Sequence, residues 1–126
     1  MSFIDTIKAK ARSDLKTIVL PESEDDRTFK AAETAVKEGF ALPVILGSEE
    51  DVKATAERLG VSLDGIRILD NTKSEDIDRY ASLLAEIRAK KGMTFEQAKE
   101  ILINDRLTFG ILMVKAGDAD GLVSGA

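Results

Sequence analysis

The sequence contains neither cysteine nor histidine. The lack of cysteine excludes disulfides, thiolate metal sites and thiol nucleophiles. The lack of histidine excludes Ser-His-Asp triads, histidine-ligated zinc and histidine general bases. Any chemistry carried by these 126 residues therefore depends on carboxylates, arginine, lysine, hydroxyl groups or backbone amides.

Aromatic residues and long apolar runs are also scarce. Aromatic residues make up 5% of the chain and hydrophobic residues 44%, so we expect a core of Leu, Ile, Val and Ala. The longest apolar run, residues 40–46, contains Pro43 and is too short to span a bilayer. The first residues lack the apolar core of a signal peptide. We therefore expect a single cytoplasmic domain with no membrane partner.

Basic residues are fewer than acidic residues. The chain carries 18 Lys and Arg against 23 Asp and Glu, a formal net charge of −5. A field of this sign repels nucleic acid and anionic membranes, so no nucleic-acid partner is expected. An anionic small molecule would have to be bound by locally placed arginine, lysine or backbone N–H groups.

The first half of the chain alternates strands with helices. Apolar runs predict buried strands at 17–20 and at 42–46, and a third, shorter strand is predicted at 66–69, where Arg67 interrupts the apolar residues. Ser23 and Ser48 precede acid-rich helix starts and are predicted as N-caps. This alternation predicts a parallel sheet with right-handed crossovers.

A short amphipathic helix is predicted ahead of the first strand. Phe3, Ile4 and Ile7 recur at helical spacing, and the helix is expected to end near Ser13. The far side carries Lys8, Lys10 and Arg12.

The second half of the chain is helical up to a final strand. An apolar stripe at spacings of three and four predicts the first helix, which Gly92 is expected to close. The stripe consists of Ile77, Tyr80, Leu84 and Ile87. Residues 94–97 form a capping box for a second helix. A third helix is predicted to follow Asp105 and to end at Gly117, before a strand at 121–123.

The last residues are typical of a ligand-binding loop. Ser124 and Gly125 follow the final strand, and open α/β sheets bind ligands just beyond the carboxyl ends of their strands. Serine and glycine allow backbone N–H groups to approach a phosphate closely, although an ordinary strand-end turn is the alternative. The sequence stops at Ala126 inside this loop, so we expect it to be the N-terminal piece of a larger domain.

Two arginines are candidates for binding an anion. Arg27 lies in the first turn of the helix after the first strand, where it either pairs with neighbouring carboxylates or presents its planar guanidinium to a ligand. Arg88 flanks the apolar stripe, and either covers that stripe with its aliphatic stem or contacts phosphate beside Lys90 and Lys91. The residues alone leave both alternatives open.

Two aspartates near the end superficially match a metal-binding loop. Asp118 and Asp120 are not followed by further spaced carboxylates, so a turn that ends the preceding helix is the favoured interpretation. No dinucleotide-binding glycine fingerprint or Walker loop is present either. No metal site is therefore predicted.

Three segments resemble the phosphate acetyltransferase family. They are Thr-Ile-Val-Leu-Pro-Glu at 17–22 with Asp25 and Arg27, Glu-Ile-Arg-Ala-Lys-Lys-Gly-Met-Thr at 86–94, and Met-Val-Lys-Ala-Gly-Asp-Ala-Asp-Gly-Leu-Val-Ser-Gly-Ala at 113–126. The segments occur in the family's order and spacing, and the last is the most specific. Phosphate butyryltransferases and the C-terminal part of some malic enzymes share weaker versions.

The resemblance implies a two-domain subunit, usually a homodimer, with the active site in the cleft between the domains. Its fold would be a three-layer α/β/α domain with a mostly parallel sheet, as in isocitrate and isopropylmalate dehydrogenases. The family transfers acetyl between acetyl phosphate and coenzyme A, a substrate and not a tightly bound cofactor, without a metal. A carboxylate deprotonates the thiol, and a serine with arginines stabilises the charged transition state.

Position by position, the resemblance assigns Arg88 and Arg27 to coenzyme A binding, the second as an arginine of the active-site region. Ser124 and Gly125 match the beginning of the acetyl phosphate loop. The serine-threonine-arginine continuation of that loop, and the second domain's catalytic aspartate and serine, have no counterpart in residues 1–126. We therefore expect no catalysis from this piece alone, whereas its parent would be a phosphate acetyltransferase of acetate metabolism.

Three alternatives stand beside this hypothesis. The first is a phosphate butyryltransferase. The second is a phospho-accepting receiver domain, with acidic residues at 24–26 and Asp70 after the third strand, but the helical stretch 71–116 leaves no room for the fourth strand and helix of that fold. The third is a complete regulatory or interaction domain with a well-ordered C-terminus.

Overall fold

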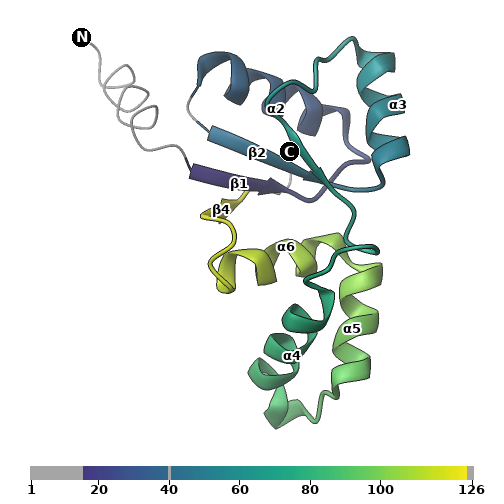
Figure 1. Ribbon diagram of the computed structural model, residues 1–126, viewed down its shortest axis with the longest axis vertical. Helices are drawn as coiled ribbons and strands as arrows, with labels where there is room; N and C mark the ends of the chain where they lie inside the picture. Colours follow the sequence, from purple (N-terminus) through teal and green to yellow (C-terminus); the bar gives the residue numbers. More distant parts are fainter. Residues whose placement is uncertain (1–15, 40, 125–126) are drawn as a thin grey trace, which may run out of the picture.

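A computed structural model of the chain describes residues 16–39 and 41–124, in which four parallel strands are flanked by helices (Figure 1). The strands are β1 (Lys16–Leu20), β2 (Ala41–Leu46), β3 (Arg67–Leu69) and β4 (Gly121–Leu122). The helices are α2 (Asp26–Glu38), α3 (Glu49–Leu59), α4 (Ile77–Ile87), α5 (Phe95–Asn104) and α6 (Arg106–Lys115), with a 3₁₀ turn η1 at Ala89–Lys91. The helix predicted between Phe3 and Ser13 lies outside the described residues. None of the described helices is long and apolar enough to cross a membrane.

The strands pair in the order β3-β2-β1-β4, and every pair is parallel. The chain steps from β1 to β2 through α2 and from β2 to β3 through α3, then returns past both strands through α4, α5 and α6 to reach β4. Because parallel crossovers are right-handed, steps in opposite directions place their helices on opposite faces. Figure 1 shows α2 and α3 above the sheet and α4–α6 below it. The predicted three-layer α/β fold is confirmed.

Alternate residues of the central strands contribute to two separate cores. Val19 of β1 packs with the α4–α6 layer, whereas Leu20 packs with α2 and α3. In β2, Leu46 faces the first core and Ile45 the second. Successive side chains of a strand point to opposite faces, so a strand that is covered on both sides has to be apolar throughout. This requirement explains the continuous apolar runs in the sequence.

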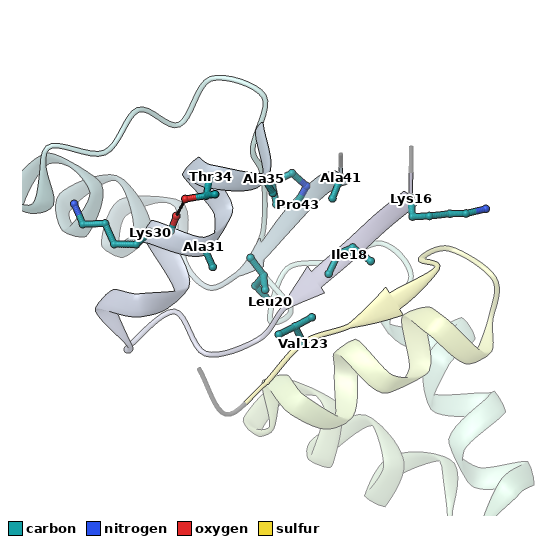
Figure 2. Close-up of a pocket in the computed structure, with 10 residues that line it drawn as sticks. All are labelled: Lys16, Ile18, Leu20, Lys30, Ala31, Thr34, Ala35, Ala41, Pro43 and Val123. Atoms are coloured by element: carbon teal, nitrogen blue, oxygen red, sulfur yellow. Dashed lines mark hydrogen bonds between the residues drawn. The ribbon is translucent and has the colours of Figure 1, made fainter. Parts of the chain in front are cut away.

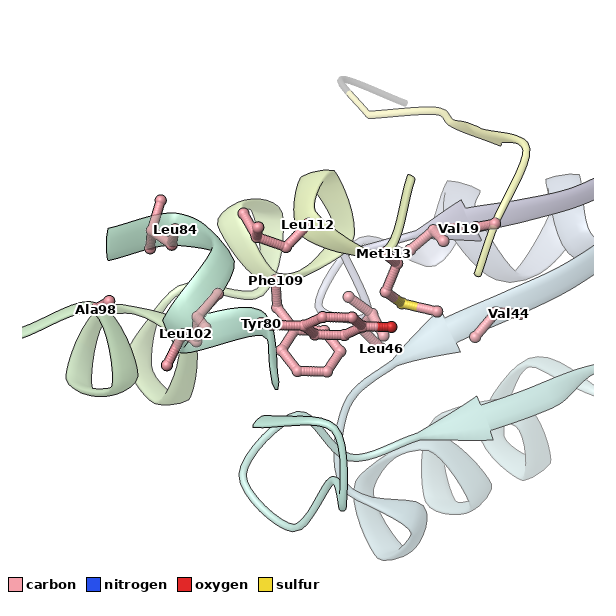
Figure 3. Packing of buried hydrophobic residues seen from close by; sticks show 12 residues of the cluster. Val19, Val44, Leu46, Tyr80, Leu84, Ala98, Leu102, Phe109, Leu112 and Met113 are labelled. Carbon is pink, nitrogen blue, oxygen red and sulfur yellow. The ribbon is translucent and has the colours of Figure 1, made fainter. Parts of the chain in front are cut away.

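The core below the sheet is centred on two aromatic rings (Figure 3). The ring centroids of Tyr80 and Phe109 lie 5.1 Å apart at an interplanar angle of 73°, the edge-to-face geometry that ring quadrupoles favour. Both side chains are fully buried, as is Phe29 in the other core. The expected aliphatic residues surround these rings, but the largest buried side chains are aromatic.

Gly110 lets α6 approach the sheet closely. A Cβ at this position would lie 2.7 Å from Leu122 Cδ1 and 3.1 Å from Val19 Cγ1. A glycine inside a helix costs about 1 kcal/mol relative to alanine. The close contact with β1 and β4 offsets that cost and sets the distance between the helix and the sheet.

Several helices begin or end at caps formed by neighbouring residues. Gly39 and Gly60 end α2 and α3 with φ of 66° and 67°, in the left-handed region that glycine adopts without strain. The Ser48 side chain caps α3 as predicted. At the start of α5, Thr94 Oγ1 accepts from the backbone N–H of Gln97, and the Gln97 side chain accepts from the backbone N–H of Thr94. The predicted capping box is therefore confirmed.

The prediction that Ser23 caps α2 is wrong. The N-cap is Asp25, whose carboxylate accepts from the backbone N–H of Arg27 at 2.9 Å. The Ser23 hydroxyl instead accepts from Nη1 of Arg106 at 2.6 Å. The local sequence pattern around Ser23 cannot show that Arg106, 83 positions later, binds its hydroxyl. The pattern therefore predicted Ser23 as the N-cap.

The first helix of the second half ends earlier than its pattern indicated. The α-helix stops at Ile87, and residues 89–91 continue as the 3₁₀ turn η1. Gly92, with φ of 72°, ends that turn and not the α-helix itself. The tighter turn redirects the chain from α4 toward α5.

Replacing Gly110 with valine should push α6 away from the sheet. The new side chain would overlap Leu122 and Val19, so we expect the free energy of unfolding to fall by about 1–3 kcal/mol. Leu107→Val, on the exposed side of the same helix, is the matched control because it introduces a β-branched side chain without the overlap. Chemical denaturation measures both variants, and equal losses would contradict the packing role of Gly110.

Candidate functional site

The carboxyl ends of the four parallel strands meet at one edge of the sheet, where open α/β sheets bind ligands. The segments that leave this edge are residues 21–25, 47–48, 70–76 and 123–124. Arg27, in the first turn of α2, and Ser124, two residues past β4, both belong to it. Two of the predicted site residues therefore lie at the same edge.

Arg27 is paired with Asp25 at the start of its own helix. Nε of Arg27 donates to Asp25 Oδ1 at 3.2 Å, and Nη2 donates to Oδ2 at 2.9 Å. These side-chain hydrogen bonds, followed by the one from the Arg27 backbone, lower the pKa of Asp25, and the pairing raises the pKa of Arg27. The Arg27 side chain is 73% exposed. Because a guanidinium carries five N–H donors, the pairing leaves donors on Nη1 for an anion.

Ser124 lies on the edge beside β1. The backbone N–H of Val123 donates to the carbonyl of Val19 at 3.0 Å, so the pairing of β4 with β1 extends to the end of the strand. Ser124 follows directly and is exposed. Gly125, the other predicted residue of this loop, lies outside the described residues.

Arg88 lies apart from this edge. It is the C-cap of α4, where the chain turns through η1 toward α5. Figure 1 shows this turn at the end of the α4–α5 hairpin that points away from the sheet. Arg88 is exposed and its side chain forms no ion pair with the residues that the structure describes, and Lys90 and Lys91 are exposed beside it. The structure therefore does not bring Arg88 together with Arg27 or Ser124.

Arg106 belongs to the edge, although it was not among the predicted site residues. It is the first residue of α6, which runs away from the carboxyl ends of the strands. Its Nη1 donates to Ser23 Oγ and its Nη2 donates to Glu24 Oε2, each at 2.6 Å. Arg106 thereby joins the segment after β1 to the start of α6. One feature of the local sequence indicated this position: Arg106 directly follows Asp105, where the helix was predicted to start.

A polar hollow of about 300 Å³ lies over the ends of β2 and β3, and Ser48, Thr72 and Arg106 are among its lining residues. Its base is rigid because the buried Asn71 side chain donates to the carbonyls of Leu102 and Ile103 at 2.8 and 3.0 Å. These bonds attach the segment after β3 to the end of α5. The hollow therefore presents hydroxyl, guanidinium and carboxylate groups on a fixed frame, the last from Asp70.

The helix N-termini at this edge are already occupied by the chain's own side chains. Asp25 accepts from the backbone at the start of α2, Ser48 at the start of α3 and Asp105 at the start of α6. Free N–H groups at a helix N-terminus commonly bind phosphate, and these caps use part of that capacity. An anion at this edge would therefore depend on arginine and on the loop that begins at Ser124.

Asp118 and Asp120 lie at the opposite, amino edge of the sheet. The Asp118 carboxylate accepts from the Tyr80 hydroxyl and from Arg79 of α4. The Asp120 carboxylate accepts from the backbone N–H of Thr17 at 2.8 Å, and the Asp120 N–H donates to the Thr17 carbonyl. Both aspartates hold the start of β4 to its neighbours, in agreement with a turn rather than a metal loop.

The ionised carboxylate of Asp118 strengthens the contact between α4 and the turn before β4. Hydrogen bonds from Tyr80 and then from Arg79 lower the pKa of Asp118 below its ordinary value of 3.8. Burial, followed by the contact with Asp118, raises the pKa of Tyr80. A carboxyl group whose pKa is lower in the folded state stabilises the protein above its unfolded pKa, and loses that effect as the pH falls through the folded value. Acid should therefore weaken the contact between α4 and β4.

The sequence model for phosphate acetyl/butaryl transferases matches residues 2–126. The chain belongs to this family. The phosphate acetyltransferase of Acetivibrio thermocellus is 48% identical over 126 residues, which cover 100% of this chain and 37% of that protein. The phosphate acetyltransferase of Thermoanaerobacterium thermosaccharolyticum is also 48% identical, over 100% of this chain and 38% of its own length. The chain thus spans under two-fifths of these relatives.

Solved structures of the phosphate acetyl/butaryl transferase family share the fold. The EutD phosphotransacetylase from Staphylococcus aureus superposes with a TM-score of 0.88 at 36% identity, over 97% of this chain and 36% of that one. A phosphotransacetylase from Streptococcus pyogenes superposes with a TM-score of 0.89 at 34% identity, over 100% of this chain and 39% of that one.

The receiver-domain alternative fails on the same observations. The described residues between β3 and β4 form helices and no strand, as the pattern predicted. Asp70, its expected phospho-acceptor, accepts hydrogen bonds from the backbone N–H and the hydroxyl of Thr72 within a local turn. The family match across the chain favours the transferase hypothesis instead.

Replacing Asp118 with asparagine should destabilise the fold at neutral pH. The amide keeps an acceptor for Tyr80 but loses the charge that binds Arg79, so we expect a loss of about 1 kcal/mol, a modest value because the Asp118 side chain is 37% exposed. The loss should shrink as the pH falls below 3.8 toward the lowered pKa of the Asp118 carboxyl. Denaturation over a series of pH values from 7 downward measures it, and a loss that stays constant over the whole acid range would contradict the ionic role.

Replacing Arg106 with alanine should loosen the segment after β1. The backbone N–H of Asp25, which donates to the carbonyl of Glu22 at 3.0 Å, should exchange with deuterium roughly threefold to tenfold faster once Arg106 no longer holds Ser23 and Glu24. Lys115→Ala, at the other end of α6, is the control for removal of one positive charge. Unchanged exchange at Asp25 would show that the segment is held by other contacts.

Proposed function

We propose that the protein to which these residues belong is a phosphate acetyltransferase, which moves an acetyl group between acetyl phosphate and coenzyme A. The match of residues 2–126 to the phosphate acetyl/butaryl transferase family, with 48% identity to a relative of that name, carries the proposal. The polar edge formed by Arg27, Arg106 and the start of the loop at Ser124 supports it, because both substrates carry phosphate.

The proposed reaction places defined demands on the site. The thiol sulfur of coenzyme A attacks the carbonyl carbon of acetyl phosphate, an S–C bond forms, and the C–O bond to the phosphate breaks. The phosphate leaves with the electron pair of that bond, and a base accepts the thiol proton. Negative charge grows on the carbonyl oxygen, so oriented cationic and N–H donors stabilise the transition state.

The residues of this chain can meet part of these demands. Ser124 and Gly125 are proposed to begin the loop that binds acetyl phosphate. Arg27 is proposed to contact coenzyme A near the same edge, through the Nη1 donors that its pairing with Asp25 does not use. Arg88 is proposed to bind the phosphates of coenzyme A at the hairpin tip, where Lys90 adds positive charge in an otherwise acidic chain.

The base and the remaining donors are proposed to lie in a second domain. Residues 1–126 contain no histidine or cysteine, and they correspond to 37% and 38% of two phosphate acetyltransferases. Residues 1–126 would then form the N-terminal part of the first domain, with the active site in the cleft between the domains. The proposal includes a cytoplasmic homodimer that uses coenzyme A as a substrate and holds no tightly bound cofactor.

Arg88→Ala in the full-length protein should raise the apparent KM for coenzyme A by about tenfold, the factor expected for one lost charge-assisted contact. The KM for acetyl phosphate and kcat should change much less, because Arg88 is the C-cap of α4, at the end of the α4–α5 hairpin that points away from the sheet. Steady-state kinetics with each substrate varied in turn measures the effect. Arg58→Ala removes another exposed arginine, paired with Asp26, and is the matched control.

Two results would revise the proposal in different ways. An unchanged KM for coenzyme A in the Arg88→Ala variant would remove this residue from the site and leave the activity intact. Faster turnover of butyryl phosphate than of acetyl phosphate by the wild-type protein would place it with the butyryltransferases of the family. Absence of activity with either acyl phosphate would reject the proposed function.

A further inference from the structure

An apolar groove of about 650 Å³ runs between α2 and the β1–β4 side of the sheet (Figure 2). Ile18 and Leu20 of β1 form its floor, Ala31 and Ala35 of α2 form one wall, and Val123 lies on the opposite side. Val123 is 53% exposed, although its neighbours along the groove are apolar. A continuous apolar surface of this kind is a binding surface for another apolar segment.

The two faces of the sheet are covered differently at β1 and β4. On one face α6 packs directly against both strands, with Gly110 against Val19 and Leu122. On the other face α2 packs chiefly against β2, and Ile18 and Val123 line an open groove beside it. Gly121, which pairs with Ile18, adds no side chain beside it. The helical layer over β1 and β4 is therefore incomplete within residues 16–39 and 41–124.

The handedness of crossovers indicates which part of a polypeptide can fill the groove. β4 is an edge strand of the described sheet, so a further parallel strand after it would lie beyond β4. The connection to that strand would cross the sheet in the same direction as the β3–β4 connection. Because both connections are right-handed, it would lie on the α6 face, opposite the groove. Residues 1–15 precede β1 and are under no such restriction.

The first fifteen residues carry the apolar pattern that the groove requires. Phe3, Ile4, Ile7, Ala11 and Leu15 recur at intervals of three and four, which aligns them on one side of a helix. A helix over residues 3–13 would be about 16 Å long, at roughly 1.5 Å per residue. The five residues of β1 span a similar length, at about 3.3 Å per residue. The segment also ends where the groove begins, because Lys16 lines it.

We propose that residues 3–13 bind in this groove as an amphipathic helix, which residues 14–15 connect to β1, and complete the helical layer over β1 and β4. The occupant is the chain's own segment and not a second copy, since a short covalent connection gives an effective concentration in the millimolar range. This inference concerns the completion of the domain, and it holds whether or not the proposed activity is correct.

A pair of charge substitutions in the 126-residue chain tests the proposal. Ile7→Asp places a carboxylate on the apolar side of the segment, and Ala9→Asp places the same charge on the opposite side of a helix. We expect Ile7→Asp to lower the melting temperature by at least about 5 °C and Ala9→Asp to leave it nearly unchanged. Equal shifts in the two variants would overturn the proposal.

Engineered cysteines then identify where the segment binds. The natural chain contains no cysteine, so the double variant Ile7→Cys/Ala31→Cys carries the only two thiols. A disulfide requires Cα atoms about 4.4–6.8 Å apart, which the groove position of Ala31 allows for a bound segment. We expect mild oxidation to give an intrachain disulfide at least tenfold faster than in Ala9→Cys/Ala31→Cys. A disulfide between two chains, or equal rates in both pairs, would reject the intramolecular groove.

Discussion

Every connection between parallel strands in this chain has to be right-handed, and that constraint decides which helix covers which face. The chain steps outward from β1 to β3 and then returns past β1 to β4, so α2 and α3 lie on one face and α4–α6 on the other. The same parallel arrangement brings all four carboxyl ends to one edge, where Arg27, Arg106 and Ser124 belong. The groove beside α2 also follows from it, because the return step adds β4 without adding a helix on the α2 face.

The segment that most resembles the family has two physically distinct parts. Asp118 and Asp120 lie at the amino edge, where their carboxylates hold Tyr80, Arg79 and the backbone of Thr17. Ser124 lies at the carboxyl edge, beyond the strand. The aspartates thus fix the position and register of β4, and the serine begins the loop that this strand carries to the edge. The motif at 113–126 therefore contains two aspartates that fix the start of β4 and a serine that begins a candidate binding loop.

The elements of the fold could be predicted because their causes are local. The apolar runs of β1 and β2, the capping box at Thr94 and Gln97, and the Ser48 cap of α3 all act within a few residues. The prediction failed where distant residues compete, as at Ser23, whose hydroxyl accepts from Arg106 instead of capping α2. Arg106 was missed for the same reason, because the helix start at Asp105 is its one local signal and the packing of α6 is what brings it to Ser23 and Glu24. Similarly, no local pattern shows how far Arg88 lies from the strand ends.

The separation of Arg88 from the edge constrains how the proposed substrate would bind. The hairpin tip with Arg88, Lys90 and Lys91 points away from the sheet, whereas acyl transfer is proposed to occur beside Ser124. A compact ligand could not contact both regions, but coenzyme A is long and carries its phosphates far from its thiol. Under the proposed function, the tip would therefore bind the nucleotide end and contribute to KM, and the edge would position the thiol and contribute to kcat. Because the chain as a whole carries a net charge of −5, such a ligand would be attracted only by these local cations.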